Sequence, residues 1–148
     1  LAAQWQAGGL PAQAVTDLRA ACAEADIVSC ATLATEPVVQ GAWLPPGSHL
    51  DLIGSFTPAM READDACWVD ARVFVDTEEA LVKSGDLLGP LRRGALREDE
   101  VRGTLGTLCK GVATGRKSDS ERTVFKSVGT ALEDLAAAVM VLDSRASA

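Results

Sequence analysis

Short runs of β-forming residues alternate with helical stretches along most of the chain, and this alternation predicts a parallel sheet covered by helices. Three runs have the pattern of strands, namely Ile27–Ala31, His49–Ile53 and Arg72–Val75. The first run is compact and apolar between Asp26 and Thr32. We therefore expect it to be buried on both faces, at the centre of the sheet.

The segments between these strands carry the signals of helices. Asp17 is the expected N-cap of a helix over Leu18–Ala25, because its short carboxylate can accept a bond from a free backbone N–H. In the same way, Asp76 or Thr77 is expected to cap a helix over Glu78–Lys83. The fold class is accordingly α/β with a Rossmann-like parallel sheet.

The pattern changes in the last third of the chain. Residues 84–110 predict only short helical pieces and loops, and residues 111–120 form a polar connector that we interpret as a crossing between domains. Beyond it, Arg122–Lys126 predicts a strand and Val128–Arg145 a long helix. We therefore expect one domain boundary, between residues 110 and 111.

Composition limits the possible partners. The chain has 148 residues, of which 47% are hydrophobic and 24% charged, as in an ordinary soluble domain. A formal net charge of −7 argues against nucleic acid, whose binding depends on clustered Lys and Arg. No apolar stretch is long enough for a membrane span and no signal peptide is visible, so we expect no membrane contact and a cytoplasmic location.

The four cysteines do not form a metal-binding pattern. Cys22, Cys30, Cys67 and Cys109 have no C-x-x-C spacing, and His49 is the sole histidine. We therefore expect no metal site, and reduced cysteines that mostly fill space in the core.

The junction between the last strand and the last helix is a candidate binding site. Lys126, Ser127 and Gly129 lie where the strand should pass into the helix. Free backbone N–H groups and a hydroxyl there would suit an anionic or polar ligand. Glu133 and Asp134 follow within the helix, where solvated surface is the simpler interpretation of an acidic pair.

Parallel sheets bind ligands at the carboxyl ends of their strands, so the segments that follow the predicted strands matter most. Taken singly, these segments have ordinary loop composition. Together, ATLATEP, IGSFTPAMRE, VDTEEALVKSGD and TVFKSVGTALEDLAAA resemble the ornithine cyclodeaminase and mu-crystallin family in order and spacing. These motifs are most similar to those of the Δ1-pyrroline-2-carboxylate reductases of that family. The resemblance extends over about residues 10–142.

The resemblance implies a nicotinamide-dependent enzyme that uses NADPH or NADH on a small cyclic imine and forms a homodimer. Residues 1–110 would be the C-terminal part of a Rossmann domain, and 111–148 the C-terminal segment of a substrate and dimerisation domain. Ser127 would lie near the nicotinamide and the substrate. The residues expected to line the cofactor are Thr32, Leu33, Ile53, Gly54, Val128 and Gly129.

Three departures from the family pattern qualify this expectation. No G-x-G-x-x-G loop is present, so we expect the phosphate loop and the substrate-gripping Arg and Lys upstream of Leu1, and no activity from these residues alone. Phe56 stands where cyclodeaminases carry an aspartate, and a phenyl ring cannot move protons. Lys83 replaces a glutamate of mu-crystallin-like relatives, and we expect it at the surface.

The favoured hypothesis is reduction of Δ1-pyrroline-2-carboxylate to proline, with the catalytic residues unassigned. Other activities of the family are alternatives, namely ornithine cyclodeamination, alanine dehydrogenation or a broader ketimine reduction. A mu-crystallin-like protein that binds a small ligand without catalysis is a further alternative. The plainest is an inert structural fragment, whose exposed sheet edge would favour aggregation.

Overall fold

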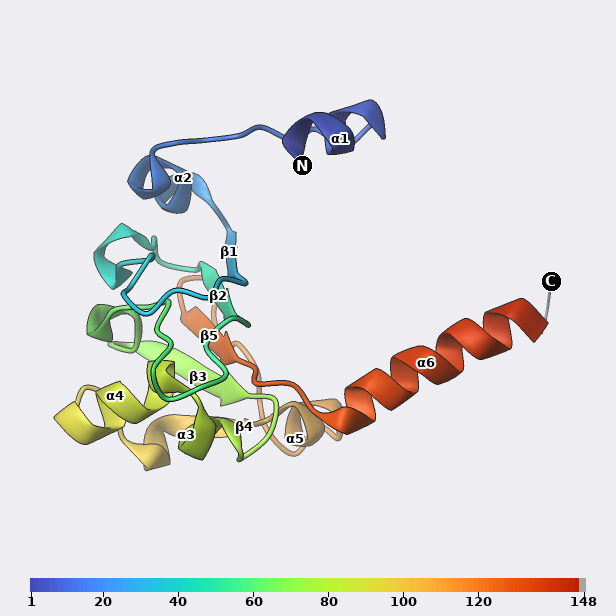
Figure 1. Ribbon diagram of the computed structural model, residues 1–148. Helices are drawn as coiled ribbons and strands as arrows, with labels where there is room; N and C mark the ends of the chain where they lie inside the picture. The colour runs from blue at the N-terminus through green and yellow to red at the C-terminus, as the bar shows by residue number, and fades with distance from the viewer. Residues whose placement is uncertain (147–148) are drawn as a thin grey trace.

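The computed structural model describes residues 1–146, which form a five-stranded parallel sheet with helices packed around it (Figure 1). The order of the strands is β1-β2-β5-β3-β4, and every neighbouring pair is parallel. The predicted α/β class with a parallel sheet is confirmed. The strands are β1 (Ile27–Cys30), β2 (His49–Leu52), β3 (Ala71–Val75), β4 (Val101–Thr104) and β5 (Arg122–Lys126).

Six α-helices are present among the described residues. Asp17 caps the second helix as predicted, since its carboxylate accepts a bond from the Ala20 N–H at 3.0 Å. The helices are α1 (Ala2–Ala7), α2 (Leu18–Glu24), α3 (Ala80–Lys83), α4 (Gly85–Arg93), α5 (Leu105–Cys109) and α6 (Ala131–Ala146). Short 3₁₀ turns lie at η1 (Gly41–Trp43), η2 (Asp65–Cys67) and η3 (Glu98–Glu100).

The two faces of the sheet differ in burial because successive side chains of a strand point to opposite sides. Leu50, Val124 and Val73 lie side by side in register on one face, and all three are buried. That face packs against the main hydrophobic cluster, which includes Trp68 and Leu87. Side chains at the alternate positions are directed to the opposite face, namely His49 and Asp51 of β2, Thr123 and Phe125 of β5, and Arg72 and Phe74 of β3.

Strand β1 departs from the expectation. It pairs only with β2 and forms an edge of the sheet, where Ile27 is 66% exposed. Its apolar composition predicts a strand that is buried on both faces at the centre of the sheet, and this prediction is wrong. Composition reports how well a strand can pack, and it does not report how many neighbouring strands are present.

The strand at Arg122–Lys126 forms as predicted, but it lies inside the sheet between β2 and β3. The division of the chain at residues 110 and 111 stays a prediction, and both α1 and α6 extend away from the sheet (Figure 1). The edge strand β4 was missed. Its four residues include Gly103 at φ 155°, and a glycine weakens the sequence pattern of a strand.

The cysteines have the predicted free state. Cys22, Cys30 and Cys67 are buried and Cys109 is exposed, all without a disulfide. Burial raises the pKa of the Cys30 thiol to about 12, so this group is a protonated packing residue at neutral pH. Within residues 1–146, no helix is both long and apolar enough to cross a membrane.

Candidate functional site

A hollow lies at the carboxyl edge of the sheet, where β1, β2 and β5 end. Its volume is about 510 Å³. All seven residues that were predicted to line a cofactor or substrate contribute to its wall. The lining residues are Ala31, Thr32, Leu33, Ile53, Gly54, Phe56, Ser127, Val128, Gly129 and Glu133. The structure therefore brings the predicted residues together, while their roles toward a ligand stay predictions.

Backbone hydrogen bonds at the strand ends hold the three loops next to one another. The Ile53 N–H donates to the Cys30 carbonyl at 2.8 Å, which joins the ends of β1 and β2. The Ser127 N–H donates to the Leu52 carbonyl at 3.0 Å, which joins the ends of β2 and β5. Because parallel strands end at the same edge, the loops that follow them meet there.

Glu62 holds two of these loops in place through hydrogen bonds. Its side chain is fully buried. One carboxylate oxygen, Oε1, accepts bonds from the Thr32 N–H at 2.6 Å and the Thr32 hydroxyl at 2.8 Å. The other oxygen, Oε2, accepts a bond from the Gly54 N–H at 2.8 Å. Hydrogen bonds to a charged group are stronger than neutral ones, so Glu62 sets the positions of both loops.

Asp86 and Lys126 stand behind Glu62 and are also fully buried. Asp86 Oδ1 accepts bonds from the N–H groups of Glu62 at 2.8 Å and Ala63 at 3.0 Å. Lys126 Nζ donates to the Leu52 carbonyl at 3.0 Å and lies 3.9 Å from Asp86 Oδ2. Burial raises the pKa of Asp86 and lowers the pKa of Lys126. Both shifts favour the neutral forms, because charge is costly to desolvate.

Asp76 fastens the third loop, and this corrects two expectations. Its Oδ2 atom accepts bonds from the Ser127 hydroxyl at 2.9 Å and from the N–H groups of Val128 at 2.8 Å and Gly129 at 2.7 Å. Of the N–H groups predicted to be free for an anionic ligand, that of Gly129 is therefore already bonded to a carboxylate and that of Ser127 to the Leu52 carbonyl. Asp76 also does not cap α3, which has no side-chain cap. The end of β3 lies beside the end of β5, a contact between residues about fifty positions apart that local patterns cannot reveal.

Helix α6 begins later than predicted, at Ala131 rather than Val128. Thr130 and Glu133 bond reciprocally at its start: the Thr130 N–H donates to Glu133 Oε2 at 3.2 Å, and the Glu133 N–H donates to the Thr130 hydroxyl oxygen at 3.3 Å. This pair is a capping box. Glu133 and Asp134 are both exposed, which confirms the interpretation of the acidic pair as solvated surface, and Glu133 also lines the hollow.

Phe56 and Lys83 lie as their sequence positions suggested. Phe56 lines the hollow with 45% of its surface exposed, and its ring offers neither a proton donor nor an acceptor there. Lys83 is exposed and pairs with Glu79 one helical turn away, which confirms the surface interpretation.

Sequence reasoning did not find Glu62 and Asp86 as site residues, and it singled out Asp76 only as part of the segment after the third strand and as a possible helix cap. Glu62 and Asp86 lie inside two of the motifs, IGSFTPAMRE and VDTEEALVKSGD, and Asp76 is the first acidic residue after β3. Their only signal was charge next to apolar runs, which is more often exposed than buried. Their burial depends on contacts that the fold makes.

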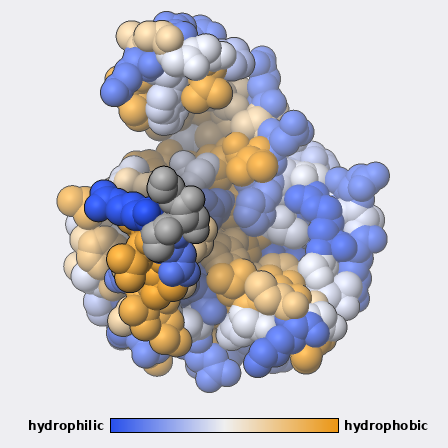
Figure 2. Space-filling view, turned by 90° about the vertical axis from the view of Figure 1, so that its right-hand side faces the viewer, coloured by the Kyte–Doolittle hydropathy of each residue, from blue (hydrophilic) through white to orange (hydrophobic). Residues whose placement is uncertain are grey.

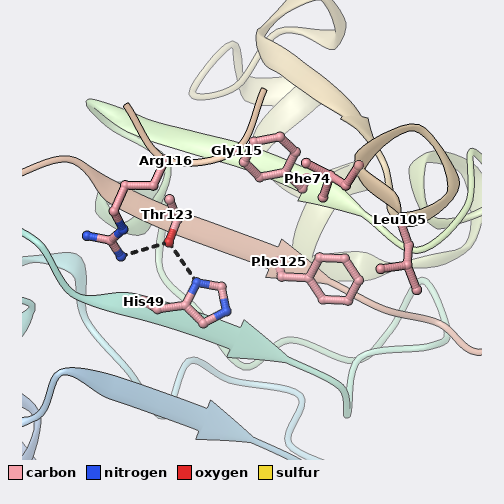
Figure 3. Close-up of a pocket in the computed structure, with 8 residues that line it drawn as sticks. His49, Phe74, Leu105, Gly115, Arg116, Thr123 and Phe125 are labelled. Atoms are coloured by element: carbon pink, nitrogen blue, oxygen red, sulfur yellow. Dashed lines mark hydrogen bonds between the residues drawn. The ribbon is translucent and has the colours of Figure 1, made fainter. Parts of the chain in front are cut away.

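A second hollow lies on the open face of the sheet (Figure 3). His49 Nδ1 and the Thr123 hydroxyl are 2.7 Å apart, and Arg116 Nη2 donates to the same hydroxyl oxygen at 3.2 Å. Burial lowers the pKa of His49. The remaining lining is mostly apolar and includes two phenylalanines. The lining residues are His49, Phe74, Leu105, Leu108, Gly115, Arg116, Thr123 and Phe125.

Comparison with known proteins identifies the family. The profile of the ornithine cyclodeaminase/mu-crystallin family matches residues 1–148. The chain belongs to this family. The predicted resemblance is thereby confirmed over a longer range than the sequence motifs alone covered.

Individual relatives agree with this assignment. The chain is 50% identical over 123 residues to the Delta(1)-pyrroline-2-carboxylate reductase of Paracoccus denitrificans, a match covering 82% of this chain and 39% of the relative. A solved structure of the Thermococcus litoralis Delta(1)-pyrroline-2-carboxylate reductase, in complex with NADH and L-proline, matches with a TM-score of 0.78 and 37% identity. That match covers 81% of this chain and 38% of the other.

A third match is an archaeal alanine dehydrogenase dimer with bound NAD. Its TM-score is 0.87 at 28% identity, and the match covers 98% of this chain and 45% of the other. The chain therefore spans less than half the length of each of these three proteins.

Proposed function

We propose that the intact protein reduces a cyclic imine carboxylate, Δ1-pyrroline-2-carboxylate, to proline with NADH or NADPH. The observation that carries this proposal is the hollow at the carboxyl edge, in which the seven predicted residues meet. Its position is the one where parallel α/β sheets bind nucleotides. The 50% identity to a Delta(1)-pyrroline-2-carboxylate reductase supports the choice of reaction.

The lining of the hollow fits the flat, uncharged end of a nicotinamide nucleotide. Leu33, Ile53, Phe56 and Val128 supply apolar surface, and most of the other lining residues are small. When bound, the nucleotide supplies the hydride for the C=N carbon. The part played by this chain is to hold that ring in place and to keep water from it, and orientation of this kind accounts for much of a rate enhancement.

Ser127 is the polar side chain proposed to meet the substrate. Its hydroxyl donates to Asp76 Oδ2 at 2.9 Å and accepts a bond from the Gly129 N–H at 3.3 Å, which leaves one oxygen lone pair to accept a bond from a protonated ring nitrogen. We therefore assign Ser127 to orienting the imine. It lines the hollow beside Val128, which brings substrate and nicotinamide to adjacent places.

Phe56 disfavours ornithine cyclodeamination. Deamination needs a group that moves protons between the amino group, the substrate and water, and a phenyl ring cannot do this. Reduction of an imine mainly needs hydride placement, which an apolar wall permits. The half-exposed ring of Phe56 in the hollow is consistent with the second chemistry.

The reaction can be tested in the intact protein by the loss of NADH or NADPH absorbance on adding Δ1-pyrroline-2-carboxylate. Proline should form in step with nucleotide oxidation. Ornithine with NAD⁺ should give no ammonia. A protein that binds the nucleotide and the imine without oxidising the nucleotide would overturn the proposal and favour a non-catalytic ligand-binding role.

Replacing Ser127 by alanine tests its assignment. We expect kcat/KM for the imine to fall about tenfold, because one hydrogen bond to a charged group is lost. The affinity for the nucleotide should stay within about twofold of the parent. An unchanged rate with the imine would remove Ser127 from the proposed mechanism.

We also propose a cytoplasmic homodimer. Helix α6 projects from the sheet, and hydrophobic residues lie along it in the space-filling view (Figure 2). Its exposed apolar side chains are Leu132, Leu135, Val139, Met140, Val141 and Leu142. A second copy of the protein would cover such a surface, and light scattering at micromolar concentration would report the dimer.

A further inference from the structure

Around the carboxyl-edge hollow, backbone N–H groups are bonded to buried carboxylates and are not free for a ligand. Strand ends in nucleotide-binding sheets often leave N–H groups free for an anion. Here four such groups are already used: Glu62 accepts the N–H groups of Thr32 and Gly54, and Asp76 accepts those of Val128 and Gly129. Two buried carboxylates therefore take up the donors that a phosphate would otherwise bind.

Each of these peptide units also carries a carbonyl oxygen, on the side opposite to its N–H group. No peptide bond among the described residues is cis, and a trans peptide holds N–H and C=O on opposite sides. The carbonyl oxygens that precede the four N–H groups are thus turned away from Glu62 and Asp76. They belong to residues that line the hollow, namely Ala31, Ile53, Ser127 and Val128.

All four carbonyls can take a further partner. None of them is an acceptor in the backbone hydrogen bonds that join residues 1–146 outside the regular helices and strands. Charge reinforces the same preference, because Glu133 lines the hollow, Glu62 and Asp76 are bonded to the backbone of its wall, and Lys126 is buried beside Asp86. An anion placed in the hollow would meet carbonyl oxygens in a negative field.

We propose that Glu62 and Asp76 are positioning residues that turn the hollow into a site for an uncharged, hydrogen-bond-donating group, and that it rejects anions. This inference rests on the proposed function: the group is the carboxamide of the nicotinamide nucleotide. The phosphates and the substrate carboxylate are then held elsewhere. Glu62 acts through Thr32 and Gly54, and Asp76 acts through the loop at Ser127.

The first test needs no variant. The intact protein is titrated calorimetrically with NAD⁺ or NADP⁺, whichever binds more tightly, and with its nicotinic acid analogue, in which a carboxylate replaces the carboxamide. We expect the acid form to bind at least about tenfold more weakly, because its oxygens face carbonyl oxygens. Equal or tighter binding of the acid form would overturn the inference.

The second test uses Glu62→Gln, which keeps the size of the side chain. The amide nitrogen cannot accept a bond, so either Thr32 or Gly54 loses its partner and its peptide can turn. We expect about tenfold weaker dinucleotide binding and a smaller preference over the acid analogue, with ADP-ribose affinity within about twofold of the parent. ADP-ribose lacks the pyridine ring, so general damage to the fold would weaken it equally, and that result would contradict the inference.

Asp65→Asn is the matched control. Asp65 lies in the same segment as Glu62, and its carboxylate bonds Arg61 and Arg93 without contacting the wall of the hollow. The change should leave both the dinucleotide affinity and the preference for the carboxamide unchanged. A loss equal to that of Glu62→Gln would show that any carboxylate of this segment matters, and would overturn the specific role of Glu62.

The two proposals fail in different ways. Preferential binding of the carboxamide form without imine turnover supports the inference and overturns the proposed reaction. Imine turnover together with equal binding of the carboxamide and acid forms supports the reaction and overturns the inference.

Discussion

The two hollows of this molecule are built on different principles. The hollow on the sheet face is lined by side chains that alternate along β2, β3 and β5, and most of them are apolar. The hollow at the carboxyl edge is lined by three strand-end loops, and buried carboxylates hold the backbone of these loops in place. The first depends on which side chains are present, and the second on where the peptide groups point.

This difference teaches where the chain should tolerate change. A site lined by side chains can lose or gain a methyl group while neighbouring side chains adjust. A site lined by backbone cannot adjust in this way, because each peptide is fixed by bonds to its neighbours and to a buried acid. Substitutions at matching positions of the two hollows should therefore have very different effects.

Gly54 and Gly115 offer the sharpest contrast, with the largest expected effect. A Cβ on Gly54 would lie 2.0 Å from the Thr32 carbonyl oxygen and 2.3 Å from Glu62 Oε1, whereas a Cβ on Gly115 would meet nothing within 4 Å. We expect Gly54→Ala to lower kcat/KM of the intact protein about a hundredfold, because the loop must move. Gly115→Ala should be silent. Similar steady-state losses in the two variants would break the comparison.

Lys126 and Thr123 compare the two faces of one strand. Lys126→Met removes one of the two donors to the Leu52 carbonyl and the buried group that lies 3.9 Å from Asp86 Oδ2, so we expect about 2–4 kcal/mol of lost stability. Thr123→Val removes a hydroxyl on the partly open face and should cost about 1 kcal/mol. Urea unfolding of both variants measures the difference. A larger loss from Thr123→Val would contradict the assigned difference between the faces.

His49 should give the smallest effect, seen as a dependence on pH. Its pKa lies below the ordinary value of 6.5 because burial disfavours the charged ring. The corresponding stability is present above pH 6.5 and is lost as the pH falls through the lowered pKa. Between about pH 8 and about pH 5, the parent should lose up to about 1 kcal/mol more than His49→Gln. Parallel unfolding midpoints across that range would contradict this prediction.

Local patterns predicted most elements that depend on neighbours along the chain. The strands at His49 and Arg122 and the Asp17 cap follow from alternation and from capping chemistry, which act over a few residues. The position of β1 and the existence of β4 did not follow, because strand order depends on contacts between distant segments. Asp76 illustrates the same limit, since its carboxylate does not cap the nearest helix, α3, and instead bonds residues that follow β5.

The sequence by itself determined the class of the sheet, the family, and the seven residues that meet at the carboxyl edge of the sheet. Sequence motifs and the ends of strands can both be recognised from residues that are close together in the chain. Only the tertiary structure decided the polarity of that hollow. Glu62 comes from a loop beyond β2, and Asp76 comes from the end of β3. Both side chains are buried beside backbone N–H groups, and their carboxylates accept hydrogen bonds that hold the loops in place. A buried carboxylate takes the donors that the fold places around it, and local sequence does not contain that arrangement.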